Sequence, residues 1–232
     1  MKRNIKKNLI IVLCLFVAGS LFAGIRLRFQ KTSLENEGRN RAQLFAQVYM
    51  DRIRESLINS ATVTKTVEYA IISNNGKLTN YKKIPASMYE YKPYLHNLQI
   101  AYRHHVEQIY PKKEDKAEHD PKINKICNYS ITHNKITIGG PMPLENNMPG
   151  IVIRNPIFIK HNGKRRFLCF VIAIVDVHIL MSSVSEALKK NGYDFELQKT
   201  DTYHKTYDTL VKEGRSSLKT DVNTSFTFCA CK

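Results

Sequence analysis

Catalytic motifs are what this sequence most clearly lacks, and their absence argues against an enzyme. No Walker loop, nucleophile elbow, zinc-type His-Glu-x-x-His or Rossmann glycine pattern occurs in it. His119 and Asp120 are neighbouring residues of the acid/base type, but directly before Pro121 they fit a helix cap better. We therefore expect no catalysis and no cofactor, and an extracellular hydrolase is only a remote alternative.

A cysteine framework is also absent. The five cysteines, Cys14, Cys127, Cys169, Cys229 and Cys231, show no regular spacing, so they do not indicate a redox compartment. Cys229 and Cys231 have no histidine or second cysteine pair near them, and a structural zinc ion needs further ligands of that kind. The sequence thus predicts no metal site.

Acidic residues are scarce beside basic ones. The chain has 36 Lys and Arg against 20 Asp and Glu, a formal net charge of +16. A nucleic-acid-binding protein clusters such charge in a recognisable module, whereas here the basic residues are spread from Lys2 to Lys232. We expect no nucleic-acid partner, and a basic surface near anionic lipid headgroups explains the charge better.

One uncharged run stands out from the mixed composition. Residues 8–25 read NLIIVLCLFVAGSLFAGI, and a helix of this length nearly crosses a bilayer core of about 30 Å. We interpret it as a transmembrane helix, with cleavage of a signal peptide after Ser20 or Ala23 as the alternative. Basic residues flank both ends, but a short basic N-terminus, here residues 1–7, usually stays in the cytoplasm. The expected protein is single-pass in the cell membrane, with the bulk of the chain extracytoplasmic.

Residues 27–70 form the next segment, which contains no Pro and a single Gly. Its apolar positions recur at helical intervals, which predicts a long amphipathic stalk helix. Its length and position suggest that it pairs with a second copy in a homodimer. The apolar positions are Leu44, Val48, Ile53, Leu57, Ile58 and Ala61.

After residue 70 the pattern changes to short apolar runs between turn residues, which predicts strands. Asn162-Gly163 predicts a type I′ hairpin turn, and residues 179–190 a helix that ends at Asn191-Gly192. Because strands and helices do not alternate as βαβ units, the fold class is α+β. The predicted strands are Leu98–Tyr102, Val106–Tyr110, Lys135–Gly139, Ile151–Ile159, Arg166–Asp176 and Tyr193–Gln198.

An ordered set of motifs carries a family resemblance. It consists of VEQIYP at 106–111, His119-Asp120, ITIGGP at 136–141, GIVIRNPIF at 150–158 and the run 167–176. Together they resemble the CHASE domain, an extracellular sensory domain of receptor histidine kinases and diguanylate cyclases. The resemblance implies PAS-like antiparallel sheet lobes with flanking helices in residues 71–200. Residues 201–232 are then a polar C-terminal tail.

The resemblance also implies ligand-binding residues. In the cytokinin receptors, which share this domain, ligand contacts lie at positions matching Gly139, Leu144 and Arg154, next to the bends at Pro141 and Pro156. Gly and Arg replace small hydroxyl residues there, so a plant-hormone ligand is not expected.

The alternation of side chains along its strand also marks Arg154 as a candidate binding residue, independently of the resemblance. Ile151 and Ile153 share one face of their strand, while Val152 and Arg154 share the other. A cation between apolar runs either points to solvent or is paired. In the paired case its planar fork suits an anionic ligand such as a carboxylate.

The leading functional interpretation is therefore a membrane-anchored sensor for an unidentified small molecule, part of a signal-transduction receptor. Family members continue into a second membrane helix and an output domain, which the sequence after residue 199 does not show. We therefore expect a truncated receptor or a sensor that acts through a partner. A membrane-anchored structural or protein-interaction module without a small-molecule ligand is the alternative.

Overall fold

The computed structural model describes residues 2–77, 92–102, 105–111, 121–144, 147–201, 206–214, 222 and 224–225. The chain divides into two units, Met1–Gln47 with Thr220–Thr224, and Val48–Lys219 with Ser225–Lys232. His119, Asp120, Cys229 and Cys231 lie outside the described residues.

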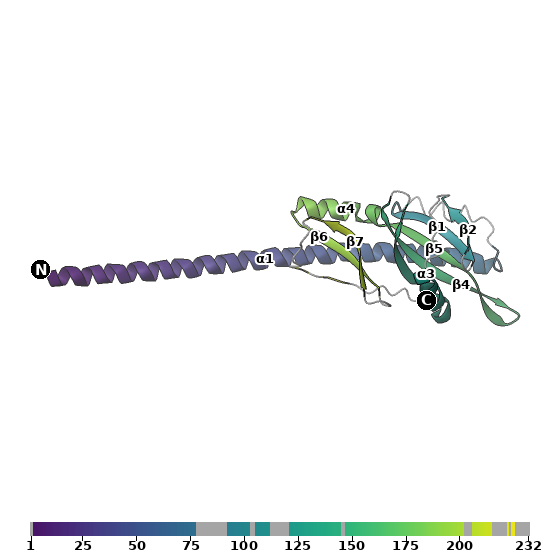
Figure 1. Ribbon diagram of the computed structural model, residues 1–232, viewed down its shortest axis with the longest axis horizontal. Coiled ribbons are helices and arrows are strands. Elements are labelled where there is room, and N and C mark those ends of the chain that lie inside the picture. The colour runs from purple at the N-terminus through teal and green to yellow at the C-terminus, as the bar shows by residue number, and fades with distance from the viewer. Residues whose placement is uncertain are drawn as a thin grey trace. The chain divides into compact units, whose positions relative to one another are not determined.

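The first unit is dominated by the N-terminal part of helix α1, which spans Lys2–Ser73 without a break (Figure 1). From Leu13 on, the helix is long and apolar enough to cross a membrane, and its apolar stretch is not buried in the protein. Phe16 and Phe22, for example, are exposed. A continuous apolar surface of this kind marks a membrane or protein interaction site. The division of α1 at residues 8–25 and 27–70 stays a prediction.

The second unit is built on an antiparallel sheet with the strand order β2-β1-β5-β4-β3. Its long strands β4 and β5 are joined by the predicted hairpin, where Asn162 and Gly163 have φ values of 51° and 74°. Both values are positive, as a type I′ turn requires. The strands are β1 (Leu95–Tyr102), β2 (His105–Tyr110), β3 (Thr137–Pro143), β4 (Pro149–His161) and β5 (Lys164–Asp176).

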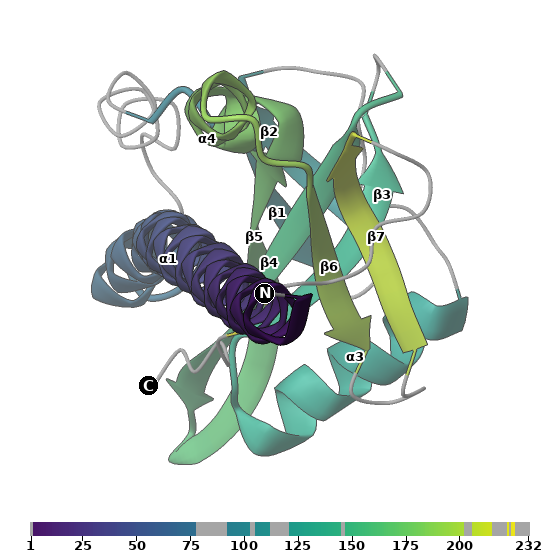
Figure 2. The ribbon, with the colours of Figure 1, turned by 90° about the vertical axis from the view of Figure 1, so that its left-hand side faces the viewer.

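Each face of this sheet is covered by a helix. The C-terminal part of α1 packs on one face, where Val67 and Ile71 join Ile100, Ile157, Cys169 and Val171 in one core cluster. Burial raises the pKa of the Cys169 thiol to about 12, so it packs there as a neutral side chain. Helix α3 (Pro121–His133) covers the other face (Figure 2). Cys127 and Ile131 of α3 pack there with Val152, Phe170, Ile172 and Ile174.

Helix α4 (Val177–Lys190) follows β5 directly. The Asp176 carboxylate accepts a hydrogen bond from the Ile179 backbone N–H at 3.1 Å, which caps the helix. Asn191 caps the other end, and Gly192 follows with a φ of 74°, so the predicted helix stop is confirmed. A second, two-stranded sheet pairs β6 (Phe195–Asp201) with β7 (Thr206–Glu213).

The predicted α+β class, a long N-terminal helix followed by an antiparallel sheet with flanking helices, is confirmed. Helix α3 and strand β7 were not predicted. Strand β7 buries Leu210 while Tyr207 stays exposed, so its sequence has little of the apolar alternation that marks a strand. Pairing with β6 defines it instead.

Candidate ligand site at Arg154

Arg154 lies in the middle of β4, on the face of the sheet that α3 covers. Strands β3 and β5 flank β4, with Thr137 and Ile172 as the register partners of Arg154. The residue is only 3% exposed. The interpretation of Arg154 as a solvent-facing side chain is therefore wrong, because the uncovered strand face that it assumed lies under α3.

Gly139 makes room for the guanidinium. A Cβ atom built on Gly139 would lie 2.5 Å from Nη1 of Arg154, which is closer than any real contact of that kind. Because Gly139 has no side chain, the Arg154 guanidinium can lie next to the backbone of the neighbouring strand β3. Gly139 and Arg154 are two of the three positions that the CHASE resemblance implies as ligand contacts.

One nitrogen of the Arg154 guanidinium lacks a partner that would balance its burial among the described residues. Nη1 of Arg154 is buried without a hydrogen-bond partner in the part of the chain that the structure describes. An unsatisfied buried polar group costs about 1–3 kcal/mol, and a charged one costs more. A buried arginine of this kind calls for a further partner, such as a ligand, an ion or an ordered water molecule.

The local electrostatics agree with this picture. Burial lowers the pKa of Arg154, an effect that the nearby Cys127 opposes. Burial also raises the pKa of the Cys127 thiol, against the smaller opposite influence of Arg154. The thiol therefore stays neutral near pH 7 and does not balance the charge of Arg154, because a guanidinium does not lose its proton in a protein.

The other predicted site residues are distributed differently. Leu144 is 3% exposed and belongs to the apolar cluster under α3, next to Val152. Pro156 is buried on β4, two residues beyond Arg154 and opposite Phe170. Pro141 is exposed and lies at the bulge that interrupts the pairing of β3 with β4. The structure thus gathers Gly139, Leu144, Arg154 and Pro156 on one face and leaves Pro141 at its rim.

Sequence reasoning missed further polar residues on this face. Thr137 is the register partner of Arg154, and its Oγ1 is buried without a hydrogen-bond partner among the described residues. On β1, Gln99 donates from Nε2 to Oδ1 of Asn97 at 3.1 Å, and Nδ2 of Asn97 is left unpaired in the described part of the chain. The available signal was the spacing of Asn97 and Gln99, two residues apart in an otherwise apolar strand.

A polar contact on the opposite face connects the same strand to α1. Asn155, the residue after Arg154, is fully buried and donates from Nδ2 to Oε2 of Glu68 at 2.8 Å. Because successive side chains of a strand point to opposite faces, β4 carries Arg154 toward α3 and Asn155 toward α1. A shift of β4 would therefore be felt at both helices.

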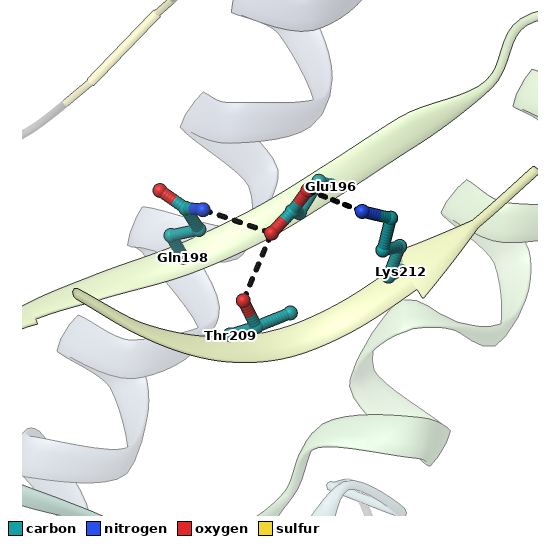
Figure 3. Close-up of polar contacts among 4 residues, drawn as sticks. All are labelled: Glu196, Gln198, Thr209 and Lys212. Carbon is teal, nitrogen blue, oxygen red and sulfur yellow. Dashed lines mark hydrogen bonds and ion pairs between the residues drawn. The ribbon is translucent and has the colours of Figure 1, made fainter. Parts of the chain in front are cut away.

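The hairpin of β6 and β7 carries the other prominent polar cluster. The Glu196 carboxylate accepts hydrogen bonds from Gln198 and Thr209, each at 2.8 Å, and lies 3.3 Å from Lys212 Nζ (Figure 3). The hydrogen bond from Gln198 is the first cause of its lowered pKa. This carboxylate is partly exposed and both of its oxygens have partners, so it stabilises the hairpin and offers no free group to a ligand.

Known structures resemble this one in fold. An extracellular ligand binding receptor from Desulfohalobium retbaense DSM5692 matches with a TM-score of 0.56 and 13% identity, over 73% of this chain and 30% of that chain. The ligand-binding domain of the Pseudomonas fluorescens chemoreceptor CtaA, in complex with L-isoleucine, matches with a TM-score of 0.51 and 14% identity, over 78% of this chain and 71% of that chain. The chain therefore shares its fold with these two ligand-binding domains. No protein-family model and no curated protein matches the sequence.

Proposed function

We propose that this chain is the extracytoplasmic, membrane-anchored sensory part of a signal-transduction receptor, related to the CHASE type, and that it binds a small anionic ligand at Arg154. The observation that carries the proposal is the buried Arg154 guanidinium, whose Nη1 has no partner among the described residues. An anion that accepts from this nitrogen would remove the cost of its burial, and charge-assisted hydrogen bonds of this kind are strong. Gly139, Leu144 and Pro156 complete the proposed site, with Pro141 at its rim.

The proposed ligand acts by shifting an equilibrium. A ligand changes the state of a receptor only if it binds one conformation better than another. Strand β4 joins the two relevant contacts, since Arg154 precedes Asn155, which hydrogen-bonds to Glu68 of α1. Binding at Arg154 would favour one position of β4 relative to α1, and α1 is the helix that carries the candidate membrane span.

The test uses the full chain in detergent micelles, screened with a library of small metabolites by thermal shift and then by calorimetry. We expect at least one anionic compound to raise Tm in a concentration-dependent manner. Arg154→Gln should weaken its binding by about 30-fold or more, because truncating one partner of a buried charge pair costs about 2–5 kcal/mol. Arg165→Gln is the matched control, because Arg165 is exposed and stacks on Phe158. The proposal fails if no compound binds, or if Arg154→Gln and Arg165→Gln bind equally well; the first result would favour an interaction module.

The proposed receptor is a homodimer through the stalk. In one heptad frame, Leu27, Leu34, Leu44 and Val48 of α1 fall on a and d positions and are 66%, 69%, 64% and 59% exposed. The a and d positions between them are polar and hold Gln30, Glu37 and Arg41. A second copy would cover the exposed apolar side chains of this frame. Single cysteines placed in residues 43–56, in a background with Cys14 replaced by Ser, should crosslink with helical periodicity that peaks at positions 44 and 48. Equal crosslinking on all sides of the helix, or none, would contradict a stalk dimer.

A further inference from the structure

Thr137 and Arg154 form a matched pair of donors across two neighbouring strands. They are direct register partners on β3 and β4, so their Cα atoms are about 5 Å apart and their side chains share one face. Both side chains end in buried atoms, Oγ1 and Nη1, that have no hydrogen-bond partner among the described residues. Two such atoms on one face of neighbouring strands suggest that one missing group pairs with both.

The chemistry of this missing group follows from the donors. A guanidinium donates hydrogen bonds and accepts none, and a threonine hydroxyl donates while it rotates to suit its partner. A carboxylate has two acceptor oxygens and so can take one hydrogen bond from Arg154 and one from Thr137. Gly139 acts as a positioning residue, because its missing Cβ lets the guanidinium lie beside β3.

The net charge of the ligand is restricted further. Arg154 forms no ion pair with any of the described residues, and the pKa of the neighbouring Cys127 thiol is raised by burial. A ligand with one negative charge would neutralise the site. The zwitterion of an amino acid would bring an ammonium group next to an uncompensated guanidinium, and like charges at this range repel strongly away from water.

The side chains around Arg154 determine which chemical group the rest of the ligand, beyond its carboxylate, can carry. Besides the polar Thr137, Asn97 and Gln99, the face that carries Arg154 holds an apolar cluster that includes Val152, Phe170, Ile172 and Leu144. They would favour an aliphatic or aromatic remainder. We infer that the ligand is a monocarboxylate with an apolar remainder and no ammonium group, held by Arg154 and Thr137; this inference rests on the function proposed above.

The experiment compares matched probes on the full chain in micelles by calorimetry. The central set is 3-methylpentanoate, L-isoleucine and 3-methylpentanamide, which share one carbon skeleton. Straight-chain carboxylates from acetate to hexanoate and phenylacetate, each with its α-amino acid and amide counterparts, cover other sizes. We expect at least one carboxylate to bind, and its amino acid and amide counterparts to bind at least about tenfold more weakly.

Thr137→Val tests the second anchor, because valine keeps the shape of threonine and removes its hydroxyl. It should weaken binding of the best carboxylate by about tenfold, as expected for loss of a hydrogen bond to a charged group. Thr209→Val is the matched control, since Thr209 hydrogen-bonds to Glu196 on the other sheet. Unfolding of the unliganded variants checks that both fold.

The outcomes separate this inference from the proposed function. If an amino acid binds more tightly than its matched carboxylate and depends on Arg154, sensing stands and the monocarboxylate inference is overturned. The same holds if the best carboxylate binds Thr137→Val and wild type equally. If no compound binds in a way that depends on Arg154, both the inference and the proposed function fail.

Discussion

The two faces of the five-stranded sheet are both buried, yet they differ in how many of their buried polar side chains have hydrogen-bond partners. On the α1 face, Nδ2 of Asn155 donates to Oε2 of Glu68 at 2.8 Å, while its Oδ1 has no partner among the described residues, and the remaining contacts form an apolar cluster. On the α3 face, Arg154, Thr137 and Asn97 each keep a buried donor without a partner among the described residues. Among the described residues, the α1 face thus leaves one neutral acceptor unpaired, whereas the α3 face leaves three donors unpaired, one of them charged. The α3 face has given up more stability, which is typical of binding sites.

The largest expected effect lies on the α1 face. Ile157 is fully buried in the cluster that α1 covers. Ile157→Ala should lower the free energy of unfolding by about 2–5 kcal/mol, because it removes buried methylene groups and leaves a cavity. Chemical denaturation of the full chain measures this loss. The affinity for a ligand at Arg154 should stay within about twofold of wild type at a temperature where the variant is folded. A loss of affinity without a loss of stability would remove the distinction between the two faces.

The next effect has the opposite sign and lies on the α3 face. Arg154→Met keeps an unbranched, although shorter, side chain and removes a buried charge whose Nη1 has no partner among the described residues. Without ligand, the variant should be more stable than wild type by about 1–3 kcal/mol, since the cost of the unpaired donor disappears. The same denaturation experiment measures it, with Arg165→Met as the exposed control. If Arg154→Met is destabilising, the guanidinium has a protein partner and the site is structural.

How far the sequence predicted this arrangement depends on the range of the interaction involved. The β4–β5 hairpin and helix α4 were predictable, because Asn162-Gly163 and Asn191-Gly192 act through local backbone preferences. The alternation of Val152 and Arg154 against Ile151 and Ile153 was also local, and the opposite faces are confirmed. Whether Arg154 meets water or protein depends on α3, whose short amphipathic sequence begins with Pro121 and gave no strong periodic signal.

Thr137 shows most clearly what could not be predicted from the sequence. A lone threonine in a strand is an ordinary β-former, and nothing in its neighbourhood marks it as a binding residue. It becomes one only through the register that places it opposite Arg154. That register is set across a bulge between Gly139 and Met142 and the turn that follows. The sequence analysis selected Gly139, Leu144 and Arg154 by resemblance, and the physical relation between Gly139 and Arg154 emerged only from the structure.

A smaller effect should come from Gly139. An added methyl group would meet Nη1 of Arg154, the far end of a flexible side chain, so the guanidinium can move away without a change in the backbone. Gly139→Ala should therefore reduce affinity by about tenfold, which corresponds to about 1.4 kcal/mol, and change the free energy of unfolding by less than about 1 kcal/mol. Calorimetry and denaturation measure the two quantities. Gly163→Ala does not serve as a control because its φ is positive; the exposed helical Gly38→Ala does.

An unfolding free energy that falls by several kcal/mol in Gly139→Ala would contradict this account. It would mean that the guanidinium is fixed in place by the core, so that Gly139 supports the fold itself and does not position Arg154 for a ligand.

The smallest expected effect is the energetic coupling between contacts on the two faces of the sheet. Glu68→Gln keeps an acceptor for Nδ2 of Asn155 but removes its charge, so the hydrogen bond should lose about 1 kcal/mol or less. Glu55→Gln, an exposed position on the same helix, is the control. A double-mutant cycle of Glu68→Gln with Arg154→Met should give a coupling energy of at least about 0.5 kcal/mol, because both contacts depend on the position of β4. Strict additivity would show that β4 transmits nothing between its faces, and the route from ligand to α1 would have to lie elsewhere.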